Sequence, residues 1–484
     1  MTRRWTLDEL IAGLVGQRSA GLDVPVLPVI DSRKAEAGTV FFAFVGERVD
    51  GHDYVADALA RGAAAAVVER NVEVDASLVD VAQGLPPAGL RLPLLIRVPS
   101  VLGALQTSAK VWRRSLGPRI VGVTGSVGKT TTKELIVRVL GSRFRVLGSG
   151  GSYNNEIGLP LTLLKMDSDH QAGVLEMGMY VRGDIRSLAD IAQPHIGVVT
   201  NVAEVHAERA GALADIAEAK RELVEALPPA PEGIAVLNYD DPYVRSMAPH
   251  TRARVFSYGL APEADLSADE ITVLGLKGLH LRLCYQGERV ELATPLLGRH
   301  SVYTVLRAAA VGLVEGLTWP EILRGVQEPG PRLRLVVLAG VGGTQIVDDS
   351  YNSSPASAVA ALDFLAALPG RRVAVLGDML ELGQYEEDGH LRVGARAAAV
   401  VQQLLTVGPR ARLIAEAAQR AGLPASSIHT VDDSLAAIPV LRTLLQPSDV
   451  VLIKGSRSMR MEQIVAALRV AEPLPDDHTA GSQG

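Results

Sequence analysis

The stretch of sequence that decides the fold is Arg119-Ile120-Val121-Gly122-Val123-Thr124-Gly125-Ser126-Val127-Gly128-Lys129-Thr130-Thr131. It passes from an apolar strand through a glycine-rich turn into the start of a helix, which is the context that a phosphate-binding loop requires. Glycines let the backbone wrap phosphate oxygens, and the amides at a helix start point toward the anion. The pattern is the short form TGxxGKT, since Val123 stands where the longer form has its first glycine. The stretch therefore predicts a nucleotide site in which Lys129 neutralises the outer phosphates and the Thr130 hydroxyl holds Mg²⁺.

Strand and helix patterns alternate on both sides of this loop and divide the chain into three α/β domains. A chain of 484 residues has room for two to four domains. We expect a small N-terminal domain over residues 1–112, a central nucleotide-binding domain over 113–331 and a C-terminal domain over 332–471, followed by a disordered tail at 472–484. Continuous apolar runs such as residues 196–200 are typical of parallel strands that are covered on both faces. The same alternation in the C-terminal domain predicts a second parallel sheet.

The composition argues against several classes of function and location. A net charge of -6 provides no broad basic surface for general nucleic-acid binding. The sequence has no run of 18 apolar residues and no apolar signal-peptide core at its start, so we expect no membrane span and no secretion. The single cysteine, Cys284, cannot form an internal disulfide and suits a reducing cytoplasm, while its alternating neighbours predict a strand. We therefore expect a cytoplasmic protein.

Three polar residues downstream of the loop could take part in chemistry. Glu176 ends an apolar strand, His206 follows the strand that ends near Asn201, and Lys220 lies in a helical segment. A carboxylate is a preferred ligand of Mg²⁺, and an imidazole is a less common one. Taken singly, each residue also has a structural interpretation: an ion-paired loop carboxylate, a surface histidine and a solvated lysine. Spacing alone leaves both interpretations open.

From near Asp31 to near Glu462, the chain resembles the Mur ligase family, the ATP-dependent ligases of bacterial cell-wall synthesis, in the order of the family's motifs. The resemblance covers almost the whole chain. Beside the phosphate loop, it rests on Asn154-Asn155-Glu156-Ile157-Gly158-Leu159-Pro160, Leu175-Glu176-Met177-Gly178, Thr200-Asn201 through His206, and Ala217-Glu218-Ala219-Lys220-Arg221-Glu222.

The resemblance implies ATP and Mg²⁺ as cofactors and assigns residues to them. It implies that Glu176, His206 and Lys220 are catalytic together with Lys129, and that Lys220 is a carbamate, which makes it an anionic metal ligand beside Thr130. It places the nucleotide on Thr124, Gly125, Ser126, Gly128, Lys129, Thr130, Thr131, Arg332 and Asp349.

Two segments depart from the family's pattern. Ser301 and Thr304 stand where the family's GRHNxxN helix has asparagines, and Pro331 replaces the glycine of its PGRL hinge. The first departure affects contacts with the nucleotide base, and not the phosphate chemistry.

Within the family, the chain resembles the members that add the dipeptide D-alanyl-D-alanine to a UDP-N-acetylmuramoyl tripeptide through an acyl phosphate. The segments that carry this likeness are 31–34, 46–53, 348–355, 376–383 and 454–458. The likeness implies a UDP-binding N-terminal domain and a Rossmann-like C-terminal domain. Because an enclosed three-domain plan needs no partner, we expect a monomer. Diaminopimelate, lysine and ornithine all stay open as the third residue of the tripeptide. Expected substrate contacts are Ser32, Arg33, Asn154, Asn155, Tyr351, Asn352 and Lys454.

Two other functions compete with this interpretation. Another ligase of the family or a folylpolyglutamate synthetase would share the central motifs, although the N-terminal Asp31-Ser32-Arg33 segment argues against the folate enzyme. The segment 407–410 also lacks the DNPR motif of the diaminopimelate-adding ligase. A nucleotide switch or ATPase motor would need an aspartate at the end of its metal-binding strand, where this chain has Glu176.

Overall fold

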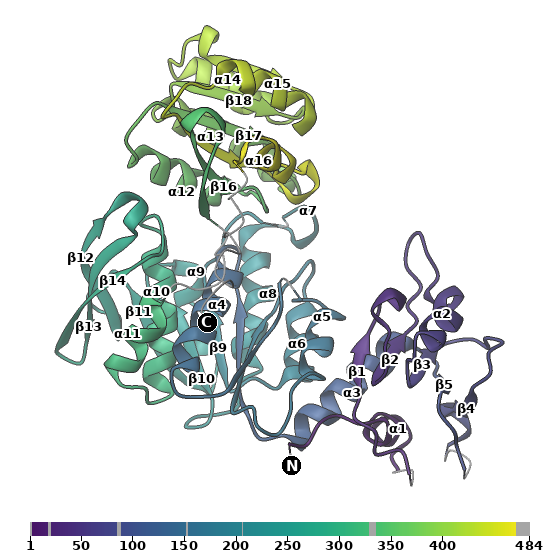
Figure 1. Ribbon diagram of the computed structural model, residues 1–484. Coiled ribbons are helices and arrows are strands. Elements are labelled where there is room, and N and C mark those ends of the chain that lie inside the picture. The colour runs from purple at the N-terminus through teal and green to yellow at the C-terminus, as the bar shows by residue number, and fades with distance from the viewer. Residues whose placement is uncertain are drawn as a thin grey trace, which may run out of the picture.

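The computed structural model describes residues 2–17, 21–84, 89–151, 153–205, 207–328 and 335–470. Three separate sheets make up three α/β domains, so the expected fold class is confirmed. Figure 1 shows the N-terminal domain to one side of the central domain and the C-terminal domain above it. The tail expected at 472–484 lies outside the described residues.

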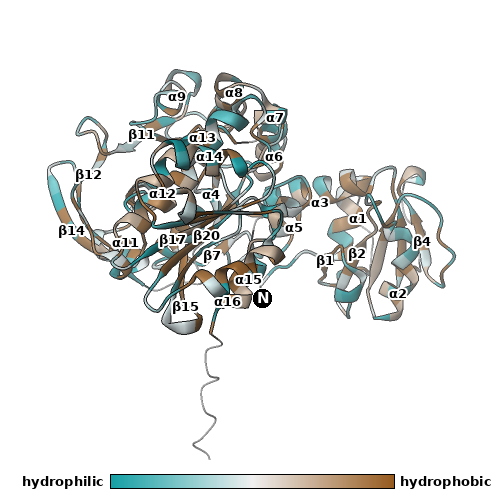
Figure 2. Cartoon of the chain, turned by 90° about the horizontal axis from the view of Figure 1, so that it is seen from above, coloured by the Kyte–Doolittle hydropathy of each residue, from teal (hydrophilic) through white to brown (hydrophobic). Residues whose placement is uncertain are grey.

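The N-terminal domain is a five-stranded parallel sheet in the order β1-β2-β3-β5-β4. Its last helix contacts the central domain: Trp112 Nε1 donates to Met166 O at 2.9 Å, and Arg113 Nε donates to Ala192 O at 3.0 Å. Figure 2 shows the domain set apart from the other two. Its elements are α1 (Leu7–Val15), β1 (Leu27–Val29), β2 (Thr39–Phe42), α2 (Val55–Ala60), β3 (Ala65–Val68), β4 (Ser77–Asp80), β5 (Leu94–Arg97) and α3 (Val101–Ser115).

The central domain holds a nine-stranded sheet in the order β14-β13-β12-β11-β10-β9-β6-β8-β7. The strand of the phosphate loop, β6, lies between β8 and β9 and pairs with both in parallel. The elements on this side are β6 (Arg119–Thr124), α4 (Lys129–Gly141), β7 (Val146–Gly148), α5 (Gly158–Leu163), β8 (Ala172–Glu176), α6 (Asp184–Ala192), β9 (Ile196–Val199), α7 (Ala207–Ala210), α8 (Leu213–Glu225) and β10 (Ile234–Asn238).

The far edge of this sheet is an antiparallel extension, which the alternation of strands and helices does not predict. There β13 pairs antiparallel with both neighbours, and Cys284 lies on it, as the alternation at 279–284 predicts. The elements are α9 (Pro242–Arg245), β11 (Arg254–Gly259), β12 (Leu266–Val273), β13 (Leu279–Tyr285), β14 (Glu288–Thr294), α10 (Ser301–Val314) and α11 (Trp319–Gln327).

The C-terminal domain is a six-stranded sheet in the order β15-β16-β20-β17-β18-β19, and it is parallel except for β15. The predicted second parallel sheet is therefore present. Its elements are β15 (Val336–Ala339), β16 (Gln345–Asp349), α12 (Pro355–Ala366), β17 (Arg372–Gly377), α13 (Glu386–Ala398), β18 (Gln403–Val407), α14 (Arg412–Arg420), β19 (Ile428–Val431), α15 (Ser434–Leu444), β20 (Val450–Lys454) and α16 (Glu462–Leu468).

The two larger sheets direct the carboxyl ends of their central strands toward one pocket. Ser126 follows β6 and Glu176 ends β8, while Tyr351, Leu380 and Arg457 follow β16, β17 and β20. Ligands of open α/β sheets bind at these strand ends. Within the described ranges, none of the helices combines the length and the apolar composition that crossing a membrane requires.

A half-buried histidine ties the phosphate-loop strand to its neighbour and makes the stability of the central domain depend on pH. His195 Nδ1 accepts a hydrogen bond from Ile120 N at 3.2 Å, at the start of β6. Burial, with Arg119 and Arg113 nearby, lowers the pKa of His195 to about 4. The unfolded chain therefore binds the proton more tightly, and this stabilisation is complete above about pH 6.5 and lost as pH falls toward 4.

We expect His195→Gln to flatten that dependence. When the pH falls from 7 to 4.5, the free energy of unfolding of the wild-type protein should decrease by up to about 3 kcal/mol more than that of the variant. Thermal denaturation at each pH measures this difference. His250→Gln, which changes an exposed histidine of the same domain, is the control and should behave as the wild type. Identical pH profiles for wild type and His195→Gln would contradict the assignment.

Candidate active site

The phosphate loop has a shape that only glycine permits at two positions. Gly125 has φ +140°, and a Cβ there would lie 1.8 Å from Thr200 Oγ1. Gly128 has φ +84° and precedes the first residue of α4. Both conformations are costly for residues with a side chain. The loop thus forms a tight cradle at the start of a helix, where backbone amides attract phosphate oxygens.

The end of β9 holds this cradle in place. Asn201 accepts from Ser126 N through its backbone oxygen and from Val127 N through Oδ1, both at 2.9 Å. Thr200 Oγ1 donates to Val127 O at 2.8 Å. The predicted Thr200-Asn201 segment therefore has a positioning role that its motif spacing does not reveal.

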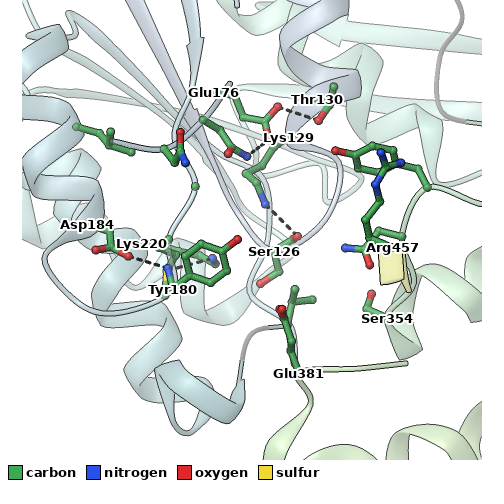
Figure 3. Close-up of a pocket in the computed structure, with 18 of the residues that line it drawn as sticks. Ser126, Lys129, Thr130, Glu176, Tyr180, Asp184, Lys220, Ser354, Glu381 and Arg457 are labelled. Carbon is green, nitrogen blue, oxygen red and sulfur yellow. Dashed lines mark hydrogen bonds between the residues drawn. The ribbon is translucent and has the colours of Figure 1, made fainter. Parts of the chain in front are cut away.

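Three polar side chains meet beside the loop, and Figure 3 shows two of them, Thr130 and Glu176, joined by a hydrogen bond. Thr130 Oγ1 donates to Glu176 Oε2, and Asn154 Nδ2 donates to Glu176 Oε1, each at 2.8 Å. Lys129 Nζ donates to the loop carbonyls of Gly125 at 2.8 Å and Ser126 at 3.3 Å. The structure thus brings Lys129, Thr130, Glu176 and Asn154 together. A buried carboxylate beside a hydroxyl is an all-oxygen donor set that suits Mg²⁺.

Lys220 lies in the same pocket and is almost completely buried. Its Nζ contacts Met179 Sδ at 3.6 Å. Burial, and then the charge of Lys129, hold the pKa of Lys220 well below its usual range. The sequence interpretation of a solvated helix lysine is therefore wrong. A neutral amine is nucleophilic, and it is the form that reacts with CO₂ to give a carbamate.

The C-terminal domain forms the facing wall. Lys454 is buried, and its Nζ donates to Asp349 Oδ2 at 2.6 Å and to Asn352 O at 2.8 Å. The guanidinium of Arg457 lies 4.8 Å from the ring centre of Tyr351. The predicted residues Asp349, Tyr351, Asn352 and Lys454 are thus adjacent at the ends of β16 and β20.

Two pockets open from the phosphate loop. The first has a volume of about 770 Å³ and runs between the central and C-terminal domains. Asn155 lies on its wall, and Asn155 Oδ1 accepts a hydrogen bond from Gly158 N at 2.9 Å. The second has a volume of about 540 Å³ and is lined by Thr131, Asp349, His300 and apolar side chains. Ser126 and Gly128 border both, so a molecule with a phosphate chain could extend from one pocket into the other.

The second pocket also contains the two departures from the asparagine pattern. Ser301 Oγ donates to Leu297 O at 2.7 Å, within the turn that begins α10, and Thr304 is buried one turn later. Burial lowers the pKa of the neighbouring His300. This wall is therefore less polar than one with two asparagine amides.

Two predicted site residues lie in the N-terminal domain, and two fall outside the described part of the chain. His206 and Arg332 lie outside the described residues. Ser32 is buried in the N-terminal domain, and the exposed Arg33 pairs with Asp31 at 2.8 Å. Neither residue lines the two pockets. Thr124, the remaining loop residue, is buried and donates to Met177 O at 2.9 Å.

One buried cation behind the loop was missed in the sequence. Arg307 Nη1 donates to Thr132 Oγ1 at 2.8 Å, and its Nε donates to Tyr258 Oη at 3.0 Å. A Cβ on Gly128 would lie 3.2 Å from Arg307 Nη1. The available signal was a lone arginine in the otherwise apolar helix α10. Arg307 supports the first turn of α4 from behind.

The segment that precedes α8 also contacts the C-terminal domain. Glu208 N donates to Glu381 O at 3.2 Å, and Leu213 N donates to Tyr385 Oη at 3.3 Å. Arg392 pairs with Glu204 at 3.1 Å. We call these three contacts the interdomain bridge. It joins the segment leading to Lys220 with the segment that follows β17.

Comparisons with known proteins cover all three domains. Three family models match, described as the Mur ligase family, catalytic domain (residues 29–107), the Mur ligase middle domain (123–312) and the Mur ligase, glutamate ligase domain (333–457). The UDP-N-acetylmuramoyl-tripeptide–D-alanyl-D-alanine ligase of Bacillus subtilis (strain 168) is 34% identical over 457 residues, which cover 92% of this chain and 93% of that protein.

Two solved structures are similar over most of their length. The crystal structure of MurF from Acinetobacter baumannii has a TM-score of 0.81 and 27% identity, and covers 96% of this chain and 98% of its own. The MurF ligase of Thermotoga maritima in complex with ADP has a TM-score of 0.76 and 27% identity, with coverage of 92% and 97%.

Proposed function

The chain belongs to the Mur ligase family, and we propose from this premise that it joins D-alanyl-D-alanine to a UDP-N-acetylmuramoyl tripeptide, with ATP converted to ADP and phosphate. The observation that carries the proposal is one pocket in which a phosphate loop, a buried carboxylate and a buried lysine face a wall from another domain. A switch or motor has no need of that second wall, and the similar proteins from Bacillus subtilis and Thermotoga maritima are ligases by name.

The chemistry must overcome the poor reactivity of a carboxylate toward an amine. Transfer of the γ-phosphoryl group to the tripeptide carboxylate makes an acyl phosphate, whose carbonyl carbon the dipeptide amine attacks, and phosphate leaves as the amide forms. The chain's task is to gather these anions and position them. Lys129 and the amides after Gly125 stabilise the charge that develops on the phosphates. The C-terminal wall excludes water and so protects the acyl phosphate from hydrolysis.

We propose Mg²⁺ as the metal, held by Thr130 and Glu176. Bound there, it would polarise the phosphate oxygens and neutralise their charge. Within the described residues, no three His, Cys, Asp or Glu side chains lie close enough together to hold a metal ion by themselves. Two protein oxygens completed by phosphate oxygens and water are the usual surroundings of Mg²⁺. His206 and a carbamylated Lys220 remain proposed ligands of a second ion.

The remaining parts of the substrates are assigned by position. The second pocket suits the nucleoside of ATP, with Asp349 at the ribose, and Arg332 is proposed to reach the same nucleotide. Asn154 and Asn155 border the first pocket, where the tripeptide would enter. Ser32 and Arg33 are proposed to bind the UDP moiety from the N-terminal domain. We also propose a cytoplasmic monomer, since ATP is consumed and a single chain supplies every proposed contact.

The proposal is tested by phosphate release with ATP, the UDP-muramoyl tripeptide and one amine at a time. We expect release with D-alanyl-D-alanine and none with single amino acids. Running the assay with lysine, diaminopimelate and ornithine tripeptides identifies the accepted third residue. Release with a single amino acid in place of the dipeptide would move the protein to another ligation step, and release without any amine would favour a simple ATPase.

A further inference from the structure

The incoming dipeptide carries a free carboxylate that the reaction does not use, and the first pocket must accommodate that charge. This consideration rests on the proposed function. An anion in a pocket that already holds phosphates and carboxylates needs its own cation. The described lining of the first pocket contains three basic side chains: Lys129, Lys220 and Arg457.

Two of these three basic side chains, Lys129 and Lys220, lie where other parts of the substrates would bind. Lys129 Nζ lies on the carbonyls of the phosphate loop, where phosphates would bind. Lys220 is buried against Met179 in the central domain, on the side where the acyl group would form. Figure 3 shows Arg457 on the other side of the pocket from Lys220, with Lys129 between them. Arg457 is thus the basic side chain on the C-terminal wall.

The surroundings of Arg457 suit a planar anion. It opens the short turn Arg457–Met459 directly after β20, and the side chain is exposed to the pocket. Its guanidinium lies over the Tyr351 ring at 4.8 Å. Stacking restrains the orientation of the guanidinium and leaves its edge available for two parallel hydrogen bonds to a carboxylate. Among the described residues, the ion pairs do not include Arg457, and the carboxylate of Asp349 on the same wall is already paired with Lys454 at 2.6 Å.

We propose that Arg457, oriented by Tyr351, binds the terminal carboxylate of the incoming dipeptide and thereby selects for it. The arrangement places the carboxylate on one wall and the amine toward the acyl carbon across the pocket. A dipeptide spans about 7 Å between these ends, and a single amino acid held by the same carboxylate would present its amine about one residue short of the acyl carbon.

The test combines substitutions of Arg457 with removal of the carboxylate from the dipeptide. Phosphate release is measured with D-alanyl-D-alanine and with its C-terminal amide, for the wild type, Arg457→Gln and Arg457→Lys. We expect the wild type to show a KM for the amide about 100-fold higher than for the dipeptide, as for loss of a charge-assisted pair. Arg457→Gln should raise the KM for the dipeptide by a similar factor, leave the KM for the amide unchanged and so remove the discrimination. Arg457→Lys should keep part of it.

The other kinetic constants separate this role from alternatives. The KM values for ATP and for the UDP-muramoyl tripeptide, and kcat at saturating dipeptide, should change less than about threefold. Arg420→Gln, which changes an exposed arginine of α14 outside both pockets, is the matched control and should behave as the wild type.

Several outcomes would overturn the proposal. If Arg457→Gln still has a higher KM for the amide than for the dipeptide, another residue binds the terminal carboxylate. A higher KM for the tripeptide, or equal loss with both amines in a variant that melts as the wild type does, gives Arg457 a different role. A wild-type enzyme that releases no phosphate with D-alanyl-D-alanine overturns the proposed function as well, which distinguishes the two failures.

Discussion

Lys129→Ala is expected to lower kcat for phosphate release by at least about 10³-fold, because it removes the one cation held within the described phosphate loop. The ammonium donates to loop carbonyls at 2.8 and 3.3 Å, and the residue is not part of a hydrophobic core. The variant should therefore fold and melt almost as the wild type does. Kinetics with the proposed substrates, together with thermal denaturation, measure both effects.

The control for that variant is Lys277→Ala, which removes an exposed lysine from the turn before β13. It should leave kcat unchanged. Normal turnover by Lys129→Ala would refute the assignment of residues 124–131 as the phosphate loop. A large loss of stability would instead show that the hydrogen bonds of Lys129 to the loop carbonyls maintain the loop.

The second large effect concerns Lys220 and CO₂. Burial keeps the pKa of this amine well below its usual range, so the neutral form that reacts with CO₂ is present at neutral pH. The resulting carbamate is an anion that can bind a metal ion, which the unmodified lysine cannot do. We expect activity to fall by about 10²-fold or more in CO₂-free buffer and to return with bicarbonate, in line with the loss of a charged group at a reacting centre.

Variants separate carbamylation from a simple requirement for a lysine. Lys220→Arg keeps a cation but forms no carbamate, so it should be inactive with and without bicarbonate. Labelling with ¹³C-bicarbonate should give a carbamate signal in the wild type and none in that variant. Full activity of the wild type in CO₂-free buffer, with no such signal, would show that Lys220 acts as an amine.

The sequence was most informative where local pattern and long-range packing agree. An apolar run, a glycine turn and a Lys-Thr pair predicted β6, the loop and α4, since each feature depends on neighbouring residues alone. The antiparallel edge was missed because half of the residues of β12 are polar and the strand contains a register shift between Asp269 and Thr272. Such a strand is specified by its partner β13 and not by its own periodicity.

The residues of the site also differ in how far the sequence predicts them. Thr130 and Glu176 could be predicted because the strand ends of one sheet converge at one edge. The burial of Lys220 could not, since the charged neighbours of this lysine predict a solvated side chain, and its burial follows only when β6, β9 and α6 pack against its helix. Arg457 was missed for a further reason: its place in the pocket depends on how two domains meet, and no periodicity within one domain encodes that.

The interdomain bridge couples the position of the lysine-bearing helix in the central domain to the position of the C-terminal domain. The bridge binds the segment that leads into the lysine-bearing helix α8 to the segment after β17, on the wall proposed for the dipeptide. Loss of these contacts would release the start of α8 at Glu208 and Leu213. We infer that the lysine-bearing helix is held in place from both domains, so the two walls of the pocket are positioned together.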